Sequence, residues 1–345
     1  MTRAATAVAP APGLAETVRF LERPAAYPDR PERVETEETH MARVFLTERF
    51  AYKLKKPVRY DYLDFSTVEA RRRDGLEEVR LNRRLAAGVY LGILPLTREE
   101  EGDLALDGDG EVVDWLVKMR RLPSERMLDR AIEDGTVREE DVDRAAGLLA
   151  GFYRDAPPVE ITPAEYRERF RRDLEEIRRE LSLFDLRLPA GRLEEVVGAL
   201  LGFVEERGRK LGRRVAAGRI VEAHGDLRPE HVCLTPEPVV IDCLEFSRAF
   251  RLLDPADELA FLSLECERLG AAWVGERFVE VYRAETGDRP PPDLFRFYQA
   301  FRAALRAKLA AWHTRDDERR NGAEWLAEAA DYLEWAEGYV RAMGR

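Results

Sequence analysis

The sequence predicts an α+β protein with two lobes: a small N-terminal lobe of strands and one helix, and a larger, mainly helical C-terminal lobe. The chain has 345 residues, which is more than one small hydrophobic core requires. Apolar patterning predicts strand, strand, helix, strand, strand in roughly the first 120 residues. Helical spacing prevails from Asp129 onward. We place the boundary at Arg121, which separates residues 1–121 from residues 122–345.

The first lobe is expected to contain four strands and a long helix. Two strands, residues 44–46 and 51–55, flank a short turn, and Pro57 ends the second because proline cannot donate to the ladder. Ser66 is the expected N-cap of the helix, with Glu69 completing a capping box. The helix is expected to end before Gly88, and two further strands follow at 89–97 and 111–123.

The ends and the middle of the chain give further expectations. Residues 1–16 predict a frayed tail rather than a signal peptide, since Pro10 and Pro12 interrupt the apolar stretch. Within the helical half, residues 219–250 predict an exposed loop after His224. Two short β segments, residues 232–234 and 239–241, are expected to follow that loop.

Composition excludes several classes of protein. Lys and Arg total 56 against 67 Asp and Glu, so the net charge of −11 argues against a DNA-binding partner. No apolar run approaches the ~20 residues of a membrane span. Cys233, Cys243 and Cys266 form no C-x-x-C pair. They predict small core residues in a reducing cytoplasm, without disulfides or a zinc site.

Two aspartates, sixteen residues apart, form the strongest chemical motif. Asp226 ends the run His-Gly-Asp, and Asp242 ends the run Val-Ile-Asp after the predicted hairpin. Phosphoryl transfer from ATP uses one carboxylate to orient the acceptor hydroxyl and another to hold a divalent metal ion. The earlier strand supplies Lys53 or Lys55, on one face of the strand. The helix supplies a partner carboxylate, Glu77 or Glu78.

These motifs resemble the aminoglycoside phosphotransferase family of kinase-like enzymes, specifically a poorly characterised bacterial branch. The resemblance covers residues 38–311, most of the chain. It is carried by the stretches VFLTERFAYKLKKPVRYDYLDFSTVEARR, LNRRLAAGVYLGILPL, VKMRRLP, HGDLRPEH, VVIDCLEF and DPADELAFL. It implies a protein-kinase-like fold, with ATP bound between the two lobes.

The resemblance also implies roles for individual residues. Asp226 matches the catalytic aspartate, and Asp242 matches the aspartate that binds Mg²⁺. Lys55 matches the lysine that contacts the α- and β-phosphates; Lys53 competes for that role, and Glu78 is the expected helix partner. The remaining matches are the hinge that holds adenine and the supports of the catalytic loop: Met119, Arg120, Arg121 and Leu122 for the hinge, and His224 and Asp257 for the loop.

Two departures from the family pattern matter. His231 stands five residues after Asp226, where kinases place an asparagine that binds the second metal ion. Imidazole prefers softer ions than Mg²⁺, so His231 could bind Mn²⁺, contact a phosphate, or mark a weak or inactive kinase; Glu230 and Glu245 are possible substitute ligands. Residues 36–40 replace the glycine-rich loop that covers the phosphates in protein kinases.

We therefore expect a cytoplasmic kinase that transfers the γ-phosphoryl group of ATP to a hydroxyl of a small molecule, such as an amino sugar or aminoglycoside. Mg²⁺, or Mn²⁺, is the expected metal. A protein or RNA kinase and a catalytically weak nucleotide sensor are the alternatives.

Several basic residues are expected to lie on solvated helix faces. They include residues 71–73 and 83–84, and also Arg302, Arg306 and Lys308, for which an anionic acceptor is the alternative.

Overall fold

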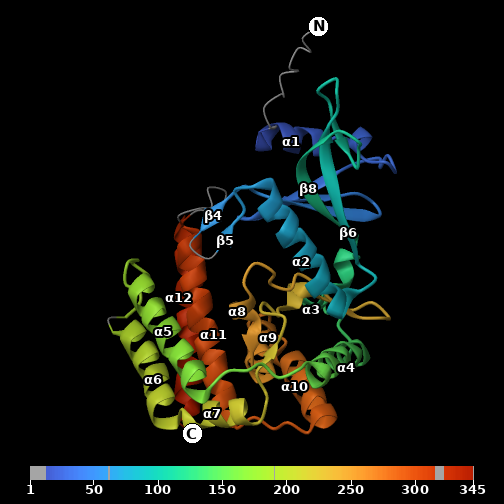
Figure 1. The fold of residues 1–345 in the computed structure, drawn as a ribbon. Helices are drawn as coiled ribbons and strands as arrows, with labels where there is room; N and C mark the ends of the chain where they lie inside the picture. The colour runs from blue at the N-terminus through green and yellow to red at the C-terminus, as the bar shows by residue number, and fades with distance from the viewer. Residues whose placement is uncertain (1–12, 61–62, 190, 315–321, 345) are drawn as a thin grey trace. The chain divides into compact units, whose positions relative to one another are not determined.

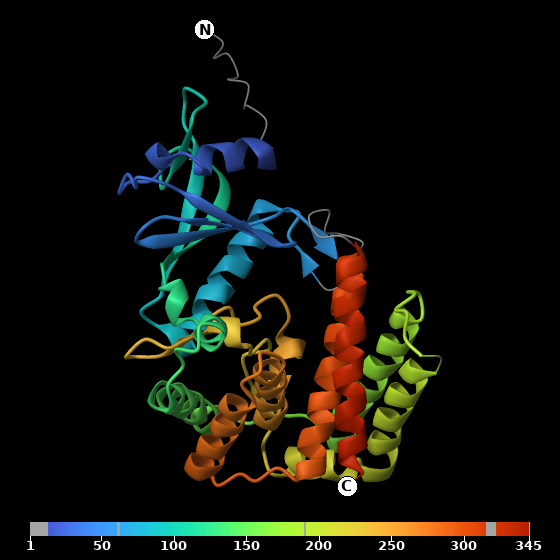
Figure 2. The same cartoon turned by 180° about the vertical axis from the view of Figure 1, so that it is seen from behind.

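The computed structural model describes residues 13–60, 63–189, 191–314 and 322–344. The chain divides into two compact units, the first ending at Pro123. The three residues Glu245–Ser247 belong to the first unit, and the rest of the chain after Pro123 forms the second. The first unit is an antiparallel sheet with one long helix, and the second is mainly helical (Figures 1 and 2). The predicted two-lobed α+β architecture is confirmed.

The sheet of the first unit has six strands in the order β1-β2-β3-β8-β6-β7, and all neighbouring strands are antiparallel. Their bounds are Glu35–Glu38, Ala42–Leu46, Phe50–Lys55, Glu111–Arg120, Tyr90–Arg98 and Leu104–Leu106, in that spatial order. A small ladder, β4 (Arg59–Tyr60) with β5 (Leu63–Asp64), precedes the helix. The sequence did not predict β1 or β7. Residues 36–38, expected in the loop over the phosphates, instead form most of the charged edge strand β1.

Helix α2 (Val68–Ala86) packs against β6 and β8, as both ribbon views show. Its N-cap is Thr67, whose hydroxyl accepts from the Ala70 amide at 3.1 Å, so the prediction of Ser66 was one residue early. Ser66 instead donates its hydroxyl to Asp64. Arg71 was expected on a solvated face, but it is buried and forms two hydrogen bonds to Asp114 of β8.

Part of the predicted frayed tail is ordered. Helix α1 (Leu14–Leu21) begins two residues before the tail was expected to end, while residues 1–12 lie outside the described part of the chain. A short 3₁₀ turn, Pro24–Ala26, leads to Tyr27, which donates its hydroxyl to the Leu21 carbonyl at 2.6 Å. The Tyr27 ring packs on Tyr52 of β3 with centroids 4.8 Å apart. These contacts join the N-terminal segment to the core of the first unit.

The second unit is built from helices, with short β ladders and 3₁₀ turns between them. The helices are α3 (Leu128–Glu133), α4 (Glu139–Asp155), α5 (Pro163–Leu181), α6 (Arg192–Arg207), α7 (Arg209–Ala216), α8 (Arg248–Arg251), α9 (Pro255–Arg268), α10 (Ala272–Thr286), α11 (Pro292–His313) and α12 (Gly322–Met343). Helices α11 and α12 run side by side (Figures 1 and 2) and share a core with α5, α6 and α9.

Two small ladders hold the loops that carry the acidic motifs. The predicted hairpin is β10 (Val232–Cys233) paired with β11 (Val239–Val240). The second ladder, β9 (Val221–Glu222) with β12 (Leu252–Leu253), was not predicted because each strand has only two residues. A 3₁₀ turn, Pro229–His231, precedes β10. All three cysteines are buried thiols, as small core residues should be.

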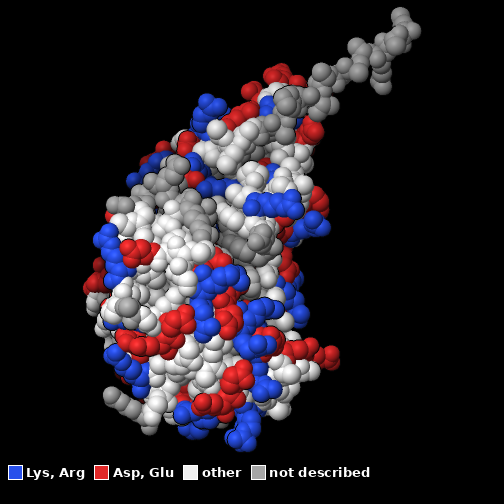
Figure 3. All heavy atoms as spheres, turned by 90° about the vertical axis from the view of Figure 1, so that its left-hand side faces the viewer, with Lys and Arg blue, Asp and Glu red and all other residues white. Residues whose placement is uncertain are grey.

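On the face drawn in Figure 3, basic and acidic side chains are intermixed. Among the described residues, no helix combines the length and the apolar character that crossing a bilayer demands.

The buried Arg71–Asp114 pair predicts a large effect on stability. Replacing Asp114 with Ala leaves a buried guanidinium without its carboxylate, so we expect the free energy of unfolding to fall by about 3 kcal/mol in urea denaturation. The exposed Glu69→Ala variant, which removes a surface pair with Arg72, should cost less than about 1 kcal/mol. An equal, small loss in both variants would contradict this account.

Candidate functional site

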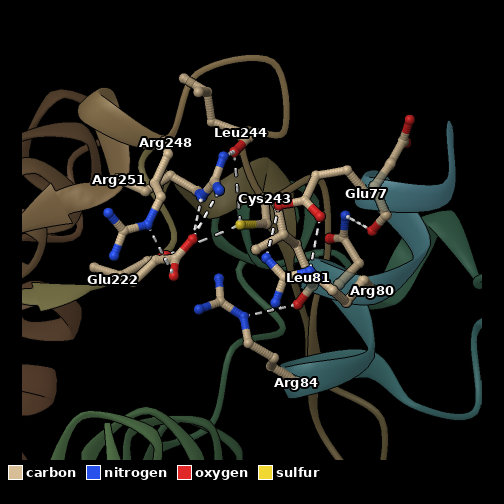
Figure 4. A network of polar contacts seen from close by, with 12 residues as sticks. Glu77, Arg80, Leu81, Arg84, Glu222, Cys243, Leu244, Arg248 and Arg251 are labelled. Atoms are coloured by element: carbon tan, nitrogen blue, oxygen red, sulfur yellow. Dashed lines mark hydrogen bonds and ion pairs between the residues drawn. The ribbon is translucent and has the colours of Figure 1, made fainter. Parts of the chain in front are cut away.

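Two lysines of β3 share one buried carboxylate in the first unit. Lys53 and Lys55 are two residues apart, so their side chains leave the same face of the strand. The Nζ atom of Lys53 lies 2.9 Å from Oε1 of Glu78, and that of Lys55 lies 2.6 Å from Oε2. Glu77 points elsewhere and pairs with Arg80 of its own helix at 2.6 Å (Figure 4). Of the two glutamates considered from the sequence, Glu78 is the one that meets the lysines.

Lys55 is enclosed by three carboxylates. Besides Glu78, its Nζ contacts Oδ2 of Asp74 at 2.6 Å and Oε1 of Glu245 at 2.5 Å. Only 3% of the lysine side chain is exposed. Burial alone would lower the pKa of Lys55, but Glu245 and Glu78 hold it above its ordinary value. Although Asp74, Glu78 and Glu245 lie close enough to bind a metal ion, the ammonium group of Lys55 already contacts all three.

Asp74 was not identified from the sequence. It lies one helical turn before Glu78, and this i, i+4 spacing is the signal that could have found it. Burial raises the pKa of Asp74 to about 7; the charge of Lys55 opposes the rise, and Glu245 and Glu78 reinforce it. Asp74 is therefore the carboxyl of this cluster that titrates near neutral pH.

In the second unit, a buried glutamate holds the loop that carries Asp226. Glu258, near the start of α9, accepts hydrogen bonds from the backbone amides of His224, at 3.1 Å, and Gly225. Tyr153 donates its hydroxyl to the same carboxylate at 2.9 Å. Gly225 has φ of 95°, and an added Cβ would lie 3.0 Å from that of Leu244, so only glycine suits this position.

The support expected from Asp257 is corrected by these contacts. Asp257 faces away from the loop and pairs with Arg302 of α11 at 2.6 Å, while its neighbour Glu258 makes the loop hydrogen bonds. Consecutive helical residues point about 100° apart, so only one of the two can face the loop. The sequence could not show which.

His224 ties together the two segments that carry the aspartates. Its Nε2 donates to the Ile241 carbonyl at 2.8 Å, one residue before Asp242, and its Nδ1 accepts from the Asp226 amide at 3.3 Å. Burial lowers the pKa of His224 to about 4, helped by the neighbouring His231. The ring is therefore neutral at pH 7, which the accepting role of Nδ1 requires.

His231 is also oriented by a hydrogen bond between a ring nitrogen and a backbone carbonyl, and its other ring nitrogen faces Asp242. A carbonyl oxygen can only accept, so the 2.7 Å contact with the Asp226 carbonyl places a proton on Nδ1 of His231. In the neutral form of the ring this proton leaves a lone pair on Nε2, which lies 3.6 Å from Oδ2 of Asp242. An imidazole nitrogen and a carboxylate oxygen at this separation can bind one divalent ion. The fit of this pair to a metal ion is thus good.

Asp226 presents an ionised, partly exposed carboxylate. Its Oδ2 lies 3.2 Å from Nε and 3.1 Å from Nη2 of Arg228, and 30% of its side chain is exposed. Burial would raise the pKa of Asp226, but Arg228, His231 and Arg306 together lower it to about 2. Arg228 was not identified from the sequence. Glu230, a possible substitute metal ligand, instead pairs with Arg228.

A buried arginine fixes the segment that follows Asp242. Arg251 donates two hydrogen bonds to Glu222, at 3.2 and 2.7 Å, and one to the Leu244 carbonyl at 2.9 Å (Figure 4). The thiol of Cys243 donates to the His224 carbonyl at 3.0 Å. Both contacts restrict the backbone of the two residues that follow Asp242.

The expected hinge residues lie at the end of β8 and just beyond it. Met119 pairs with Ala51 and Arg120 with Phe50 in the ladder with β3. Arg121 is engaged through its side chain, which donates to the Thr47 carbonyl at 2.9 Å and pairs with Glu35 at 2.7 Å. Adenine binding at this hinge stays a prediction.

Comparison with solved structures identifies the fold. A choline/ethanolamine kinase family protein from Mesorhizobium loti superposes with a TM-score of 0.56 at 17% identity, covering 95% of this chain and 98% of the other. A thermostable mutant of aminoglycoside phosphotransferase APH(4)-Ia, in a ternary complex with AMP-PNP and hygromycin B, gives a TM-score of 0.55 at 12% identity, covering 94% and 97%. The chain has the protein-kinase-like fold of the aminoglycoside phosphotransferases. The expected resemblance is confirmed at the level of that fold.

Sequence comparison adds relatives of unassigned activity. The chain is 34% identical over 282 residues to the uncharacterized protein Rv2004c of Mycobacterium tuberculosis and to its counterpart in Mycobacterium bovis. The match covers 80% of this chain and 54% of each relative, so the chain spans about half the length of the curated relatives it matches. No family model matches the sequence.

The tautomers of the two histidines can be checked directly. Long-range ¹H–¹⁵N NMR should show the proton of His224 on Nε2 and that of His231 on Nδ1, with His224 staying neutral down to about pH 4. Substoichiometric Mn²⁺ should broaden the His231 ring signals strongly, and the Asp242→Asn variant should reduce that broadening. His40, outside both clusters, serves as the control; broadening of His40 and His231 alike would contradict a metal site at His231.

Proposed function

We propose that this protein is an ATP-dependent phosphotransferase that transfers the γ-phosphoryl group to a hydroxyl of a small molecule. The observation that carries the proposal is the pair Asp226 and Asp242, whose two segments are held by hydrogen bonds of His224 and His231, with Glu258 fixing the backbone before Asp226. The Lys55–Glu78 pair of the first unit supplies the cation that such chemistry needs for the phosphates. The fold shared with kinases of small molecules supports the same conclusion.

Asp242 and His231 are the proposed metal ligands. When bound, Mg²⁺ or Mn²⁺ neutralises charge on the phosphates. The residues present one carboxylate oxygen and one imidazole lone pair, a set that favours Mn²⁺ more than the carboxylate–amide pair of protein kinases would. Lys55 contacts phosphate oxygens in this proposal, and the end of β8 at Met119 holds the adenine ring.

Asp226 orients the acceptor hydroxyl. The acceptor oxygen forms a bond to the γ-phosphorus while the bond from that phosphorus to the bridging oxygen of ADP breaks, and the hydroxyl proton passes to Asp226 and then to solvent. A carboxylate with a pKa of about 2 is a weak base, so its main contribution is position rather than early proton removal. A loose transition state for phosphoryl transfer requires little base assistance.

We also propose a reducing cytoplasm as the place of action, which the three free, buried cysteine thiols support.

One observation favours a second candidate function. His231 stands where kinases have an asparagine, which favours a nucleotide sensor with little or no turnover.

Substitution of each aspartate separates binding from turnover. Asp226→Asn should lower phosphoryl transfer by roughly 10³-fold while nucleotide affinity changes little, because Asp226 acts on the acceptor. Asp242→Asn should remove the metal-dependent increase in melting temperature caused by ATP. The exposed Asp155→Asn variant is the matched control. Equal ATPase activity in wild type and Asp226→Asn, across metals and acceptors, would favour the sensor.

Nucleotide affinity should depend on pH through Asp74. Below its pKa of about 7, Asp74 is protonated and Lys55 has one fewer carboxylate to neutralise it, so a phosphate group competes better for the lysine. From pH 8 to pH 6 we expect the affinity for ATP, measured by calorimetry, to rise roughly threefold to tenfold relative to Asp74→Asn. The ionisation of ATP itself affects both proteins equally. A wild-type to variant ratio that is constant with pH would exclude this role for Asp74.

A further inference from the structure

The second unit contains a cavity of about 520 Å³ beside the loop of Asp226. Its walls come from helices α3, α9, α11 and α12 and from the segment 228–230. Arg228 both lines the cavity and binds the carboxylate of Asp226, so one side chain links the cavity wall to the residue proposed to orient the acceptor. Sites for small molecules usually fall between about 300 and 1,000 Å³.

The signs of the lining charges alone would favour a cationic occupant. Six carboxylates and three arginines line the cavity. The pairing of these charges gives a different result. Glu230 is paired with Arg228, and Arg268 is paired with both Glu265 and Asp331 at 3.0 Å each. Glu265 also accepts a hydrogen bond from the Tyr332 hydroxyl at 2.9 Å. Arg228 and Arg268 are thus engaged by carboxylates, and Glu230, Glu265 and Asp331 each have a cationic partner.

Arg306 of α11 has no such partner. Its Nε donates to the Tyr332 hydroxyl at 3.3 Å, and its guanidinium lies 5.4 Å from the centre of that ring. Among the residues that the structure describes, no carboxylate oxygen lies within 4.0 Å of the Arg306 guanidinium; Glu265 and Asp226 act on it from farther away. Arg306 is half-buried. Removing a guanidinium from water in part, without a counterion, is unfavourable, and an arriving anion would offset that cost.

The other basic residues considered on α11 differ from Arg306 because each of them is paired with a carboxylate. Arg302 is paired with Asp257 at 2.6 Å, and Lys308 is paired with Glu176 at 2.9 Å. Of the three basic residues considered from the sequence, Arg306 alone lines the cavity, and none of the three lies on a freely solvated face.

We propose that the phosphoryl acceptor carries an anionic group, a carboxylate or a phosphate, which binds Arg306 while its hydroxyl faces Asp226. This inference rests on the phosphotransferase function proposed above and names the class of its acceptor: a hydroxylated acid or sugar phosphate rather than an amine. The planar guanidinium can bind either group through two parallel hydrogen bonds. The rings of Tyr332 and Trp335 supply apolar surface for the carbon skeleton.

Three compounds of similar size test the sign of the charge: gluconate, glucose and glucosamine, with inorganic phosphate as the minimal anion. Binding is measured by calorimetry without nucleotide, on wild type and the variants Arg306→Gln and Arg306→Lys. Arg296→Gln, on the same helix but outside the cavity wall, is the control. We expect gluconate or phosphate to bind wild type more tightly than glucosamine. We also expect Arg306→Gln to weaken that binding roughly tenfold or more, with partial recovery in Arg306→Lys.

The proposal is wrong if neither gluconate nor phosphate binds, if Arg306→Gln binds them as wild type does, or if glucosamine binds best. The comparison within wild type decides the sign of the charge even if Arg306→Gln does not fold. Metal-dependent ATP binding, measured separately, tests the proposed function. Anion binding that depends on Arg306 without any phosphoryl transfer would count against the phosphotransferase while leaving the anion site intact.

Discussion

The carboxylate of Glu258 is the interaction on which the acidic site of the second unit depends. It accepts from the backbone amides of His224 and Gly225, so it fixes the loop before Asp226 at its start. From that fixed point, His224 reaches the Ile241 carbonyl and thereby locates Asp242. A rigid chain of hydrogen bonds holds reactive groups in place more accurately than their own side-chain rotamers could.

A second buried glutamate organises the first unit in a comparable way. Glu78 binds two lysines of one strand face, which would otherwise repel each other, and it does so with no exposure to water. Asp74 and Glu245 add further negative charge around Lys55. A lysine so enclosed is held in one orientation, but it is available to a phosphate only when a carboxylate yields its place. The cluster therefore positions Lys55 accurately, while its carboxylates compete with a phosphate group for the lysine.

The sequence predicted the candidate residues for the chemistry but not all of the residues that hold them in place. The order of Lys55, Glu78, Asp226 and Asp242 follows from local motifs, and the two lobes follow from periodicity. Contacts between residues far apart in the sequence are not visible in local motifs. Glu258 and its neighbour Asp257 are both acids at the start of a helix, so the sequence does not show which of them contacts the loop. Arg71 and Asp114 pair although they are 43 positions apart. Short ladders such as β9 with β12 are below the length at which alternation can be recognised.

The backbone of Asp242 has φ of 59°, in the left-handed region that residues other than glycine, asparagine and aspartate rarely adopt. Aspartate accepts this conformation at a modest cost, which the surrounding structure compensates. A glycine would relax the turn and raise stability, yet it would remove the carboxylate that is proposed to bind the metal ion. Stability and the proposed activity therefore place opposite demands on this one residue.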